Sequence, residues 1–539
     1  MKYFNTAGPI NAAKHYCLDP LLRWDLKEVL SLIDQEKYFL VHAPRQTGKT
    51  TCLKTLARYL NDNKQLHCVY ISVEQGQAAR QDVDKGIWSL LEETALSASL
   101  QLQDEFVAQQ SRKIFESAGA ANALRNLLTK WCLHVNRPIV LLVDEIDALV
   151  GNTLISVLRQ LRAGYCVRDM MPFPQSIILC GMRHLRDYRM ELGEEGKQVF
   201  SEASPFNINS KSLRLGDFVL SDVQQLYAQH TQETGQQFEE GVCDHVFALT
   251  QGQPWLVNAL AYETCFESKA GQDRSKVITV DDINVAKERL IQTRQTHLDQ
   301  LMAKLQQERV KRVIGSIVSG QALDIAEGDV EYVMDLGLVC RDAHNSIVIA
   351  NPIYREVIPR SLSAKWQEKL EIISPQLSKL GQPLDMQELL LAFQRFFRQH
   401  SESWLDAFQY KEAGPQLLLQ AFLQRTVNSR GAIHREQAVG SRRTDLVVTW
   451  PLGDNDVTLQ RADKKQTVVL ELKLVHAHDA VATKITNGLQ QTADYMDRFH
   501  ASEGHLLIFD RRAGKSWDER IWVKQETAPD GKAITVWGL

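Results

Sequence analysis

Hydrophobic residues in the first part of the chain gather in short, nearly continuous runs, and longer stretches with helical periodicity separate these runs. Strands of a parallel sheet have this pattern when helices cover both faces of the sheet. The runs are 38–44, 68–74, 138–145 and 176–182. The pattern predicts a doubly wound α/β domain, for which we expect residues 1–215.

From residue 216 onward the pattern is that of helices. Residues 216–300 form an expected helical lid, in which Gly235 and Gly252 separate successive helices. In 301–362, two helical stretches precede two short apolar runs that a polar turn joins, an order typical of a winged helix. The segment 363–410 has a mixed helical character, and we interpret it as a helical linker.

The last part of the chain, 411–539, mixes the two patterns. An amphipathic stretch is followed by three strand-like runs, a second helical stretch and a fourth strand-like run. In order, these segments are 416–427, 432–438, 444–450, 467–475, 479–498 and 504–510. The order helix, three strands, helix, strand predicts a further α/β domain, so the chain as a whole is expected to be an α/β multidomain protein.

Composition limits the classes of function. Lys+Arg 62 against Asp+Glu 66 gives a net charge of −4, which excludes a general polycation and makes any nucleic-acid site local. Nine scattered cysteines without a CxxC pair argue against zinc fingers and a disulfide framework. There is no signal-like start and no apolar run near the roughly 20 residues that span a bilayer. We therefore expect a soluble, cytoplasmic protein with no membrane partner.

A phosphate-binding loop follows the first predicted strand. A loop that ends in Gly-Lys-Thr before a helix can wrap phosphates in backbone N–H groups at the helix N-terminus. Lys49 is then expected at the outer phosphates and Thr50 at Mg²⁺, although the first position carries alanine where glycine is usual. The expected nucleotide contacts are Ala43, Pro44, Arg45, Gln46, Thr47, Gly48, Lys49, Thr50 and Thr51.

A pair of carboxylates supports this nucleotide site. The strand 138–145 ends in Asp144 and Glu145, and such a site needs a second strand that ends in acids. We expect Asp144 to hold Mg²⁺ through water and Glu145 to orient the attacking water. The alternative is a buried strand that ends in solvated acids. The presence of both motifs in the right order favours the nucleotide site.

Three weaker signals leave alternatives open. Arg183 or Arg186 could contact the γ-phosphate or a neighbouring subunit, and an exposed arginine without such a role fits equally well. The sequence Gln-Gly-Gln-Pro at 251–254 begins a lid helix, for which a plain helix start is the simpler interpretation. The helix 329–336 carries three acids and no base, so we expect it to pack on protein and not in a DNA groove.

Residues 1–360 resemble the prokaryotic AAA+/STAND-like P-loop ATPases through the Gly-Lys-Thr loop, the Asp-Glu pair, the lid motif and the following winged helix. The resemblance implies ATP and Mg²⁺ as cofactors. It also implies possible ATP-dependent assembly into a homo-oligomer through the ATPase domain.

A second set of charged residues lies in the C-terminal domain. Glu471 and Lys473 are two apart on an apolar strand, so both side chains emerge on one face, and Asp445 lies 26 residues earlier on the preceding strand. Two such carboxylates can bind Mg²⁺, and Lys473 can position the attacking water. The alternative is a half-exposed edge strand with a surface ion pair.

The same region resembles the PD-(D/E)XK nuclease superfamily over residues 411–539. Asp445, Glu471 and Lys473 match the core motif, and Glu436 matches the acidic residue on the first strand. The resemblance implies catalytic roles for Asp445, Glu471, Lys473 and Gln491, and metal binding by Asp445, Glu471 and Glu436. Gln491 and Tyr495 match a helical Gln…Tyr pair. Glu412 could be a further metal ligand or a solvated glutamate at a helix start.

These signals lead to the hypothesis of a Mg²⁺-dependent nuclease, with Mn²⁺ as a substitute metal, whose cutting ATP controls. DNA is expected as substrate rather than RNA, and fusions of this kind suggest by analogy a role in defence against phage or mobile DNA. One alternative is an ATP-driven signalling switch or assembly platform whose C-terminal domain binds nucleic acid or a partner without cutting. Another is a remodelling motor such as a helicase loader, for which an extended basic stripe is missing from the sequence.

Overall fold

The computed structural model describes the chain in two compact units, Met1–Thr293 with Ile325–Asn351 and Arg294–Asp324 with Pro352–Leu539. The described residues are all except 64, 183–208, 294–295, 320–324, 359–382, 408–413, 428–430, 440–441, 453–463, 477–478, 511 and 513. No helix in this described part combines the length and apolar character that crossing a membrane requires.

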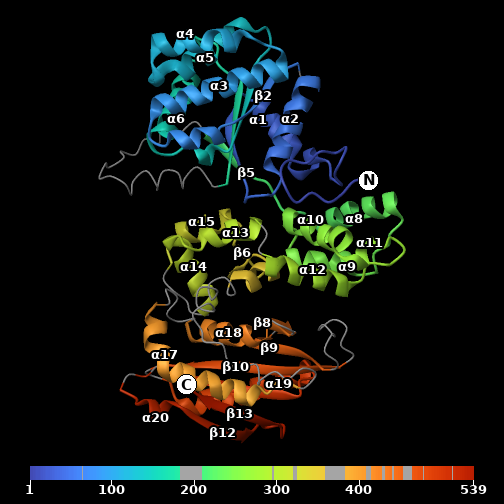
Figure 1. Ribbon diagram of the computed structural model, residues 1–539. Helices are drawn as coiled ribbons and strands as arrows, with labels where there is room; N and C mark the ends of the chain where they lie inside the picture. Colours follow the sequence, from blue (N-terminus) through green and yellow to red (C-terminus); the bar gives the residue numbers. More distant parts are fainter. Residues whose placement is uncertain are drawn as a thin grey trace. The chain divides into compact units, whose positions relative to one another are not determined.

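A five-stranded parallel sheet forms the centre of the first unit, in the order β2-β3-β4-β1-β5 (Figure 1). Its strands are β1 Tyr38–His42, β2 His67–Ser72, β3 Ile139–Asp144, β4 Ser176–Gly181 and β5 Asn209–Arg214. The four apolar runs are therefore confirmed as strands of a P-loop ATPase fold. β5 was not predicted because its sequence, Asn-Ser-Lys-Ser-Leu-Arg, is mostly polar, as an edge strand with one hydrogen-bonded neighbour permits.

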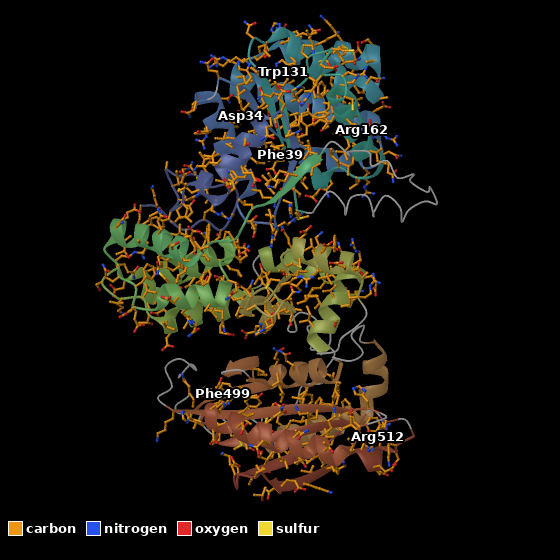
Figure 2. The ribbon with its side chains drawn as sticks, turned by 180° about the vertical axis from the view of Figure 1, so that it is seen from behind. Asp34, Phe39, Trp131, Arg162, Phe499 and Arg512 are labelled. Atoms are coloured by element: carbon orange, nitrogen blue, oxygen red, sulfur yellow. The ribbon has the colours of Figure 1, made fainter. Side chains whose placement is uncertain are left out.

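Helices cover both faces of this sheet. Phe39 and Val41 point to the face of α1 and α2, whereas Tyr38 and Leu40 point to the face of α3 to α6. Figure 2 shows Phe39 inside the domain, and it is fully buried. These helices are α1 Leu26–Asp34, α2 Lys49–Asn63, α3 Val83–Leu102, α4 Phe106–Ala118, α5 Ala120–His134 and α6 Gly151–Tyr165. Because both faces are buried, the central strands carry apolar residues at nearly every position.

The described part of the segment expected as a lid, 216–300, is mainly helical, and its role as a lid stays a prediction. It contains α8 Leu220–Thr234, α9 Val242–Thr250, α10 Pro254–Tyr262, α11 Lys269–Gln272 and α12 Val280–Thr293. The first residues of the chain pack on these helices. Phe4 is fully buried against the rings of Tyr16, Tyr227 and His230, and the Trp255 indole donates to the carbonyl of Thr6. The N-terminal segment, which we expected in the ATPase core, therefore contributes to the lid.

The predicted small hairpin is also present. β6 Val339–Arg341 and β7 Ile347–Ile349 pair antiparallel after α15 Glu327–Asp335, and all three lie in the first unit. The preceding helices, α13 Thr296–Lys304 and α14 Glu308–Ser319, lie in the second unit. The assembly of these elements into a winged helix stays a prediction.

The second unit carries a six-stranded mixed sheet in the order β12-β13-β11-β10-β9-β8 (Figure 1). Its elements are α17 Met386–Ala407, α18 Gly414–Val427, β8 Ala432–Val439, β9 Arg442–Leu452, β10 Lys464–Val475, α19 Val481–Arg498, β11 Glu503–Asp510, α20 Trp517–Arg520, β12 Trp522–Thr527 and β13 Ala533–Gly538. The predicted order helix, three strands, helix, strand is thus present from α18 to β11. β12 and β13 were not predicted, because each is a short run that is recognisable as a strand only from its pairing. β13 pairs with β11, and β12 pairs with β13.

The expected linker contributes a helix to this C-terminal domain. The side-chain amide of Gln394, on α17, donates to the carbonyls of Gly538 at 2.7 Å and Trp522 at 3.1 Å. On the same helix, the Phe393 ring contacts the rings of Phe422 and Phe509. The described part of 363–410 therefore packs on the sheet and does not simply connect two domains.

Candidate functional site

The phosphate-binding loop lies at the carboxyl end of β1 and leads directly into α2, which begins at Lys49. Gln46 and Gly48 have φ of 58° and 93°, which turn the backbone into the left-handed region. The Lys49 ammonium is buried and donates to the carbonyls of Ala43 and Pro44, both at 2.8 Å. The Thr47 hydroxyl donates to the Pro44 carbonyl at 2.8 Å. This geometry aims a helix N-terminus and a cation into one loop, as phosphate binding requires.

Asp144 lies beside this loop at the end of β3 and is fully buried. Its Oδ2 accepts hydrogen bonds from the Thr50 hydroxyl at 2.6 Å and from the Tyr70 hydroxyl at 3.0 Å. Its Oδ1 accepts from the backbone N–H of Glu145 at 2.9 Å. The structure therefore brings the two predicted Mg²⁺ residues together. It adds Tyr70, which the sequence did not single out because it lies on another strand.

Glu145 follows Asp144 in the left-handed conformation, with φ of 58°. Burial, and then the neighbouring charge of Asp144, raise the pKa of its carboxyl group, and Lys49 opposes this shift. On the next strand, burial and Asp144 raise the pKa of the Cys180 thiol well above its usual value.

Asp147 accepts from the backbone N–H of Met182 at 2.5 Å and so connects the ends of β3 and β4. Arg183 and Arg186 lie outside the described residues, so their role stays a prediction.

Arg23 joins the loop to the start of the lid. Its guanidinium donates to the carbonyls of Thr47 at 3.2 Å and Gly216 at 2.5 Å, and it lies 4.5 Å from the centre of the Phe218 ring. Burial lowers the pKa of Arg23. Arg23 could not be predicted as part of this site from the sequence, since its partners Thr47 and Gly216 lie far along the chain.

The turn after α15 touches the same loop. Asp335 pairs with His42 at 3.6 Å between Oδ1 and Nε2. Gly337 has φ of 76°, and a Cβ atom there would lie 2.6 Å from Cγ of Pro44. The acidic helix α15 therefore packs on protein in the first unit, as its charge suggested.

The lid motif is a capped helix start. Gly252 has φ of 76°, and its carbonyl accepts a hydrogen bond from the N–H of Phe218 at 2.8 Å. The Gln253 side chain accepts from the N–H of Leu256 at 2.6 Å, and Pro254 begins α10. This local geometry agrees with the simpler of the two interpretations, a plain helix start.

We expect Gly252→Ala to destabilise the lid, because the added Cβ would lie 1.9 Å from the carbonyl oxygen of Phe218. Gly235→Ala is a matched control, since Gly235 has φ of 78° and nothing lies within 4 Å of its would-be Cβ. The control should cost about 1–2 kcal/mol, and Gly252→Ala about 1–3 kcal/mol more. Urea denaturation measures both, and equal losses would contradict the close packing of Gly252.

Backbone register aligns the acidic positions of the C-terminal domain. Leu446 pairs with Leu470, while Arg435 and Gln437 pair with Leu446 and Thr444. Continuing both registers by one residue places Asp445 on β9 between Glu436 on β8 and Glu471 on β10. Directly opposite residues share a face of the sheet, so these three positions form a row. The side chains of Glu436 and Asp445 lie outside the described part of the chain, as does Glu412.

Glu471 and Lys473 lie on the face of this sheet that α19 covers. The flanking residues Val469 and Val475 pack with Leu489 and Ala493 of α19, and alternation along the strand gives Glu471 and Lys473 the same face. Glu471 is only 3% exposed, and its Oε1 accepts from the Lys473 ammonium at 2.7 Å. The alternative interpretation, a surface ion pair on a half-exposed edge strand, therefore does not fit the buried side chain of Glu471.

The helix α19 carries the two remaining matches. Tyr495 is 2% exposed and packs in the core between helix and sheet. The Oε1 of Gln491 is buried and makes no hydrogen bond within the described residues. Among the described side chains, which do not include those of Glu436 and Asp445, no three His, Cys, Asp or Glu residues form a group able to hold a metal ion.

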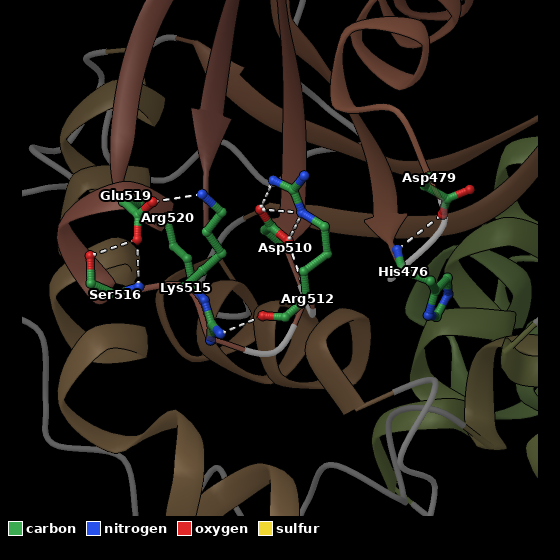
Figure 3. Close-up of polar contacts among 8 residues, drawn as sticks. All are labelled: His476, Asp479, Asp510, Arg512, Lys515, Ser516, Glu519 and Arg520. Atoms are coloured by element: carbon green, nitrogen blue, oxygen red, sulfur yellow. Dashed lines mark hydrogen bonds and ion pairs between the residues drawn. The ribbon is translucent and has the colours of Figure 1, made fainter.

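Polar contacts lie at the adjoining carboxyl ends of β10 and β11: a hydrogen bond from the His476 N–H to Asp479 after β10, and an ion pair of Arg512 with Asp510 after β11 (Figure 3). The Arg512 guanidinium contacts both oxygens of Asp510, with Nε–Oδ1 at 2.9 Å and Nη2–Oδ2 at 2.6 Å. Burial raises the pKa of Asp510, but the hydrogen bonds from Arg512 outweigh it and lower the pKa overall. Arg520 donates to the Arg512 carbonyl at 2.8 Å. These contacts join residues of one domain, so we infer that they stabilise the loop after β11.

Comparison with known proteins identifies the first part of the chain. Residues 28–358, well over half of the sequence, match the model of the AAA-like domain. The chain belongs to the AAA-like domain family. The matched residues include the loop, the Asp144-Glu145 pair and the lid, so the protein is an ATP-binding P-loop ATPase, and the expected nucleotide site at the carboxyl ends of β1 and β3 lies within the matched part. A search of curated proteins returned no match.

Solved structures of P-loop ATPases also resemble the AAA-like protein. The Walker-type ATPase PABY2304 of Pyrococcus abyssi is 14% identical with a TM-score of 0.44, over 66% of this chain and 99% of that chain. The Thermotoga maritima RuvB Holliday junction branch migration motor is 13% identical with a TM-score of 0.31, over 62% and 95%. The Aeropyrum pernix ORC1 protein in complex with DNA is 14% identical with a TM-score of 0.31, over 67% and 94%.

We expect Lys49→Ala in the AAA-like domain to weaken ATP binding about 100-fold or more. The reason is that two charge-assisted hydrogen bonds from Lys49 to the outer phosphates would contribute about 3–6 kcal/mol. Arg58→Ala, an exposed cation on the same helix, is the control. Titration with a fluorescent ATP analogue measures both affinities. If Lys49→Ala bound ATP as tightly as the control, the loop would not be the nucleotide site.

Proposed function

We propose that this protein is an ATP-controlled, Mg²⁺-dependent nuclease, with the AAA-like domain as the ATPase and residues 411–539 with α17 as the cutting domain of PD-(D/E)XK type. The observation that carries the proposal is the row Glu436, Asp445 and Glu471 on three neighbouring strands, with Lys473 on the same face as Glu471.

The buried charges support a chemical role in the C-terminal domain. A carboxylate that is 3% exposed in an otherwise apolar strand is costly unless it is paired or used. The Lys473 ammonium is a cationic partner of this carboxylate, at 2.7 Å from its Oε1. An apolar pair would fill this space without the desolvation cost, so a pair of ions here suggests function.

The residues at both sites suit Mg²⁺, a hard cation that prefers oxygen ligands. In the ATPase, the Thr50 hydroxyl and the Asp144 carboxylate converge with oxygens 2.6 Å apart, and Glu145 would orient the attacking water. In the nuclease, Asp445, Glu471 and Glu436 would hold the metal, which supplies an activated water and polarises the phosphodiester. Lys473 would position that water and stabilise charge on the phosphate, and Gln491 would contact the substrate strand from α19.

The proposal is tested with a substrate panel. Purified protein is incubated with plasmid, linear duplex, single-stranded DNA and RNA in Mg²⁺, or Mn²⁺ as a substitute, with ATP, ADP or a non-hydrolysable analogue. We expect cleavage of DNA in preference to RNA, with a rate that depends on the nucleotide. Absence of cleavage on every substrate would remove the nuclease proposal. Size-exclusion chromatography with and without ATP tests the expected homo-oligomer.

A second candidate is an ATP-driven switch or assembly platform without cutting activity. The contacts of Asp335 with His42 at the end of β1 and of Gly337 with Pro44 in the loop favour it, because a nucleotide that moves the loop would also move this turn. Calorimetry with Mn²⁺ in the absence of nucleotide separates the two candidates. A site that Asp445→Asn removes supports the nuclease, whereas an unchanged titration supports the platform. Roles in the cytoplasm and in defence against phage or mobile DNA stay proposals that follow only if cutting is found.

A further inference from the structure

The metal-binding carboxylate of the ATPase has one partner that lies outside the familiar motifs. Asp144 is completely buried, and Oδ2, the atom that receives Thr50, also accepts from the Tyr70 hydroxyl at 3.0 Å. A buried carboxylate needs such donors, because desolvation without hydrogen bonds is costly. Two donors on one oxygen and the Glu145 N–H on the other leave the carboxylate little freedom to rotate.

Tyr70 is itself held firmly. It lies on β2, an edge strand of the sheet, and among the described residues no strand pairs with one side of its backbone. The Gln101 side chain makes the hydrogen bonds that a neighbouring strand would make. It accepts from the Tyr70 N–H at 2.9 Å and donates to the Tyr70 carbonyl at 2.7 Å. The Lys54 ammonium lies 5.0 Å from the centre of the Tyr70 ring. Groups from α2 and α3 therefore fix the place from which the hydroxyl reaches Asp144.

We propose that Tyr70 is a positioning residue for Mg²⁺–ATP: its hydroxyl fixes the carboxylate of Asp144 in the orientation that the metal requires. The inference rests on the assignment of the loop and Asp144 to Mg²⁺–ATP. Thr50 has two tasks, to offer its oxygen to the metal and to bond Asp144, whereas Tyr70 has only the second. The hydroxyl of Tyr70 thus keeps Oδ2 in place while Thr50 turns to the metal. Partners of metal-binding residues commonly tune metal affinity in this way.

The test is Tyr70→Phe, which keeps the ring over which Lys54 lies and removes only the hydroxyl. Tyr38→Phe is the matched control, since the Tyr38 hydroxyl also donates to a buried oxygen, the Pro174 carbonyl at 2.8 Å, but from the opposite end of the same sheet. Binding of a fluorescent ATP analogue is measured with EDTA and across a Mg²⁺ titration. Melting temperatures of both variants record any loss of stability.

For Tyr70→Phe we expect about a tenfold rise in the Mg²⁺ concentration that gives half-maximal tight binding, with unchanged affinity for ATP in EDTA. Tyr38→Phe should match the wild type in both. The inference is overturned if Tyr70→Phe has the wild-type Mg²⁺ dependence, or if its affinity falls equally with and without Mg²⁺, which a merely structural tie between β2 and β3 would give. If the wild type binds no ATP, the ATPase assignment itself fails, and this outcome is distinct from the other two.

Discussion

Lys473→Ala is expected to lower the rate of DNA cleavage about 10³-fold while ATP binding stays at the wild-type level. Positioned groups that move or orient a proton contribute about 10²–10⁴-fold, and Lys473 also balances the charge of Glu471 at 2.7 Å. Initial cleavage rates on linear DNA with Mg²⁺ and ATP measure the effect, and an ATP titration of the same preparation reports on the first unit.

Removal of Lys473 alone leaves a buried carboxylate without this cation, which costs about 3–5 kcal/mol when a buried pair is broken. A loss of activity could then reflect unfolding, so Glu471→Gln is the second variant. It keeps the shape of the side chain and removes the charge, and it should lower cleavage by a similar factor with a smaller loss of stability. Lys524→Ala, an exposed lysine on β12, is the control. Wild-type cleavage by either site variant would refute the proposed nuclease centre.

Glu145→Gln is expected to lower ATP hydrolysis about 10²–10⁴-fold, the usual contribution of a group that orients or deprotonates the attacking water. ATP binding should stay within a few-fold of the wild type, because the substitution preserves the side-chain shape and leaves the Lys49 contacts intact. Phosphate release under saturating ATP measures hydrolysis, and the ATP titration measures binding.

Glu92→Gln is the control for Glu145→Gln, since Glu92 is an exposed glutamate on α3. It should hydrolyse ATP at the wild-type rate. Glu145 would lose its proposed role if its variant hydrolysed ATP as fast as the control. The ATP-trapped Glu145→Gln protein also shows whether bound ATP is enough to start or stop DNA cleavage, which the sequence leaves open.

The strands that could be predicted from the sequence are those that are buried on both faces along most of their length. β1 and β3 are apolar at nearly every position because helices cover both faces of the sheet. β5 was not predicted because edge positions accept polar residues, and α17 was taken for a linker because its partners, Gly538 and Trp522, lie over 120 residues further on. Local pattern cannot show a partner that distant.

By itself, the sequence determined the phosphate-binding loop, the Asp144-Glu145 pair and the shared face of Glu471 and Lys473. Each depends on residues within a few positions, where the geometry of a loop, helix start or strand is fixed by the backbone. Only the tertiary structure decided that Tyr70 bonds Asp144 and that Asp335 pairs with His42. These contacts join strands or helices that are far apart in the chain, and packing and register bring them together, which no short stretch of sequence encodes.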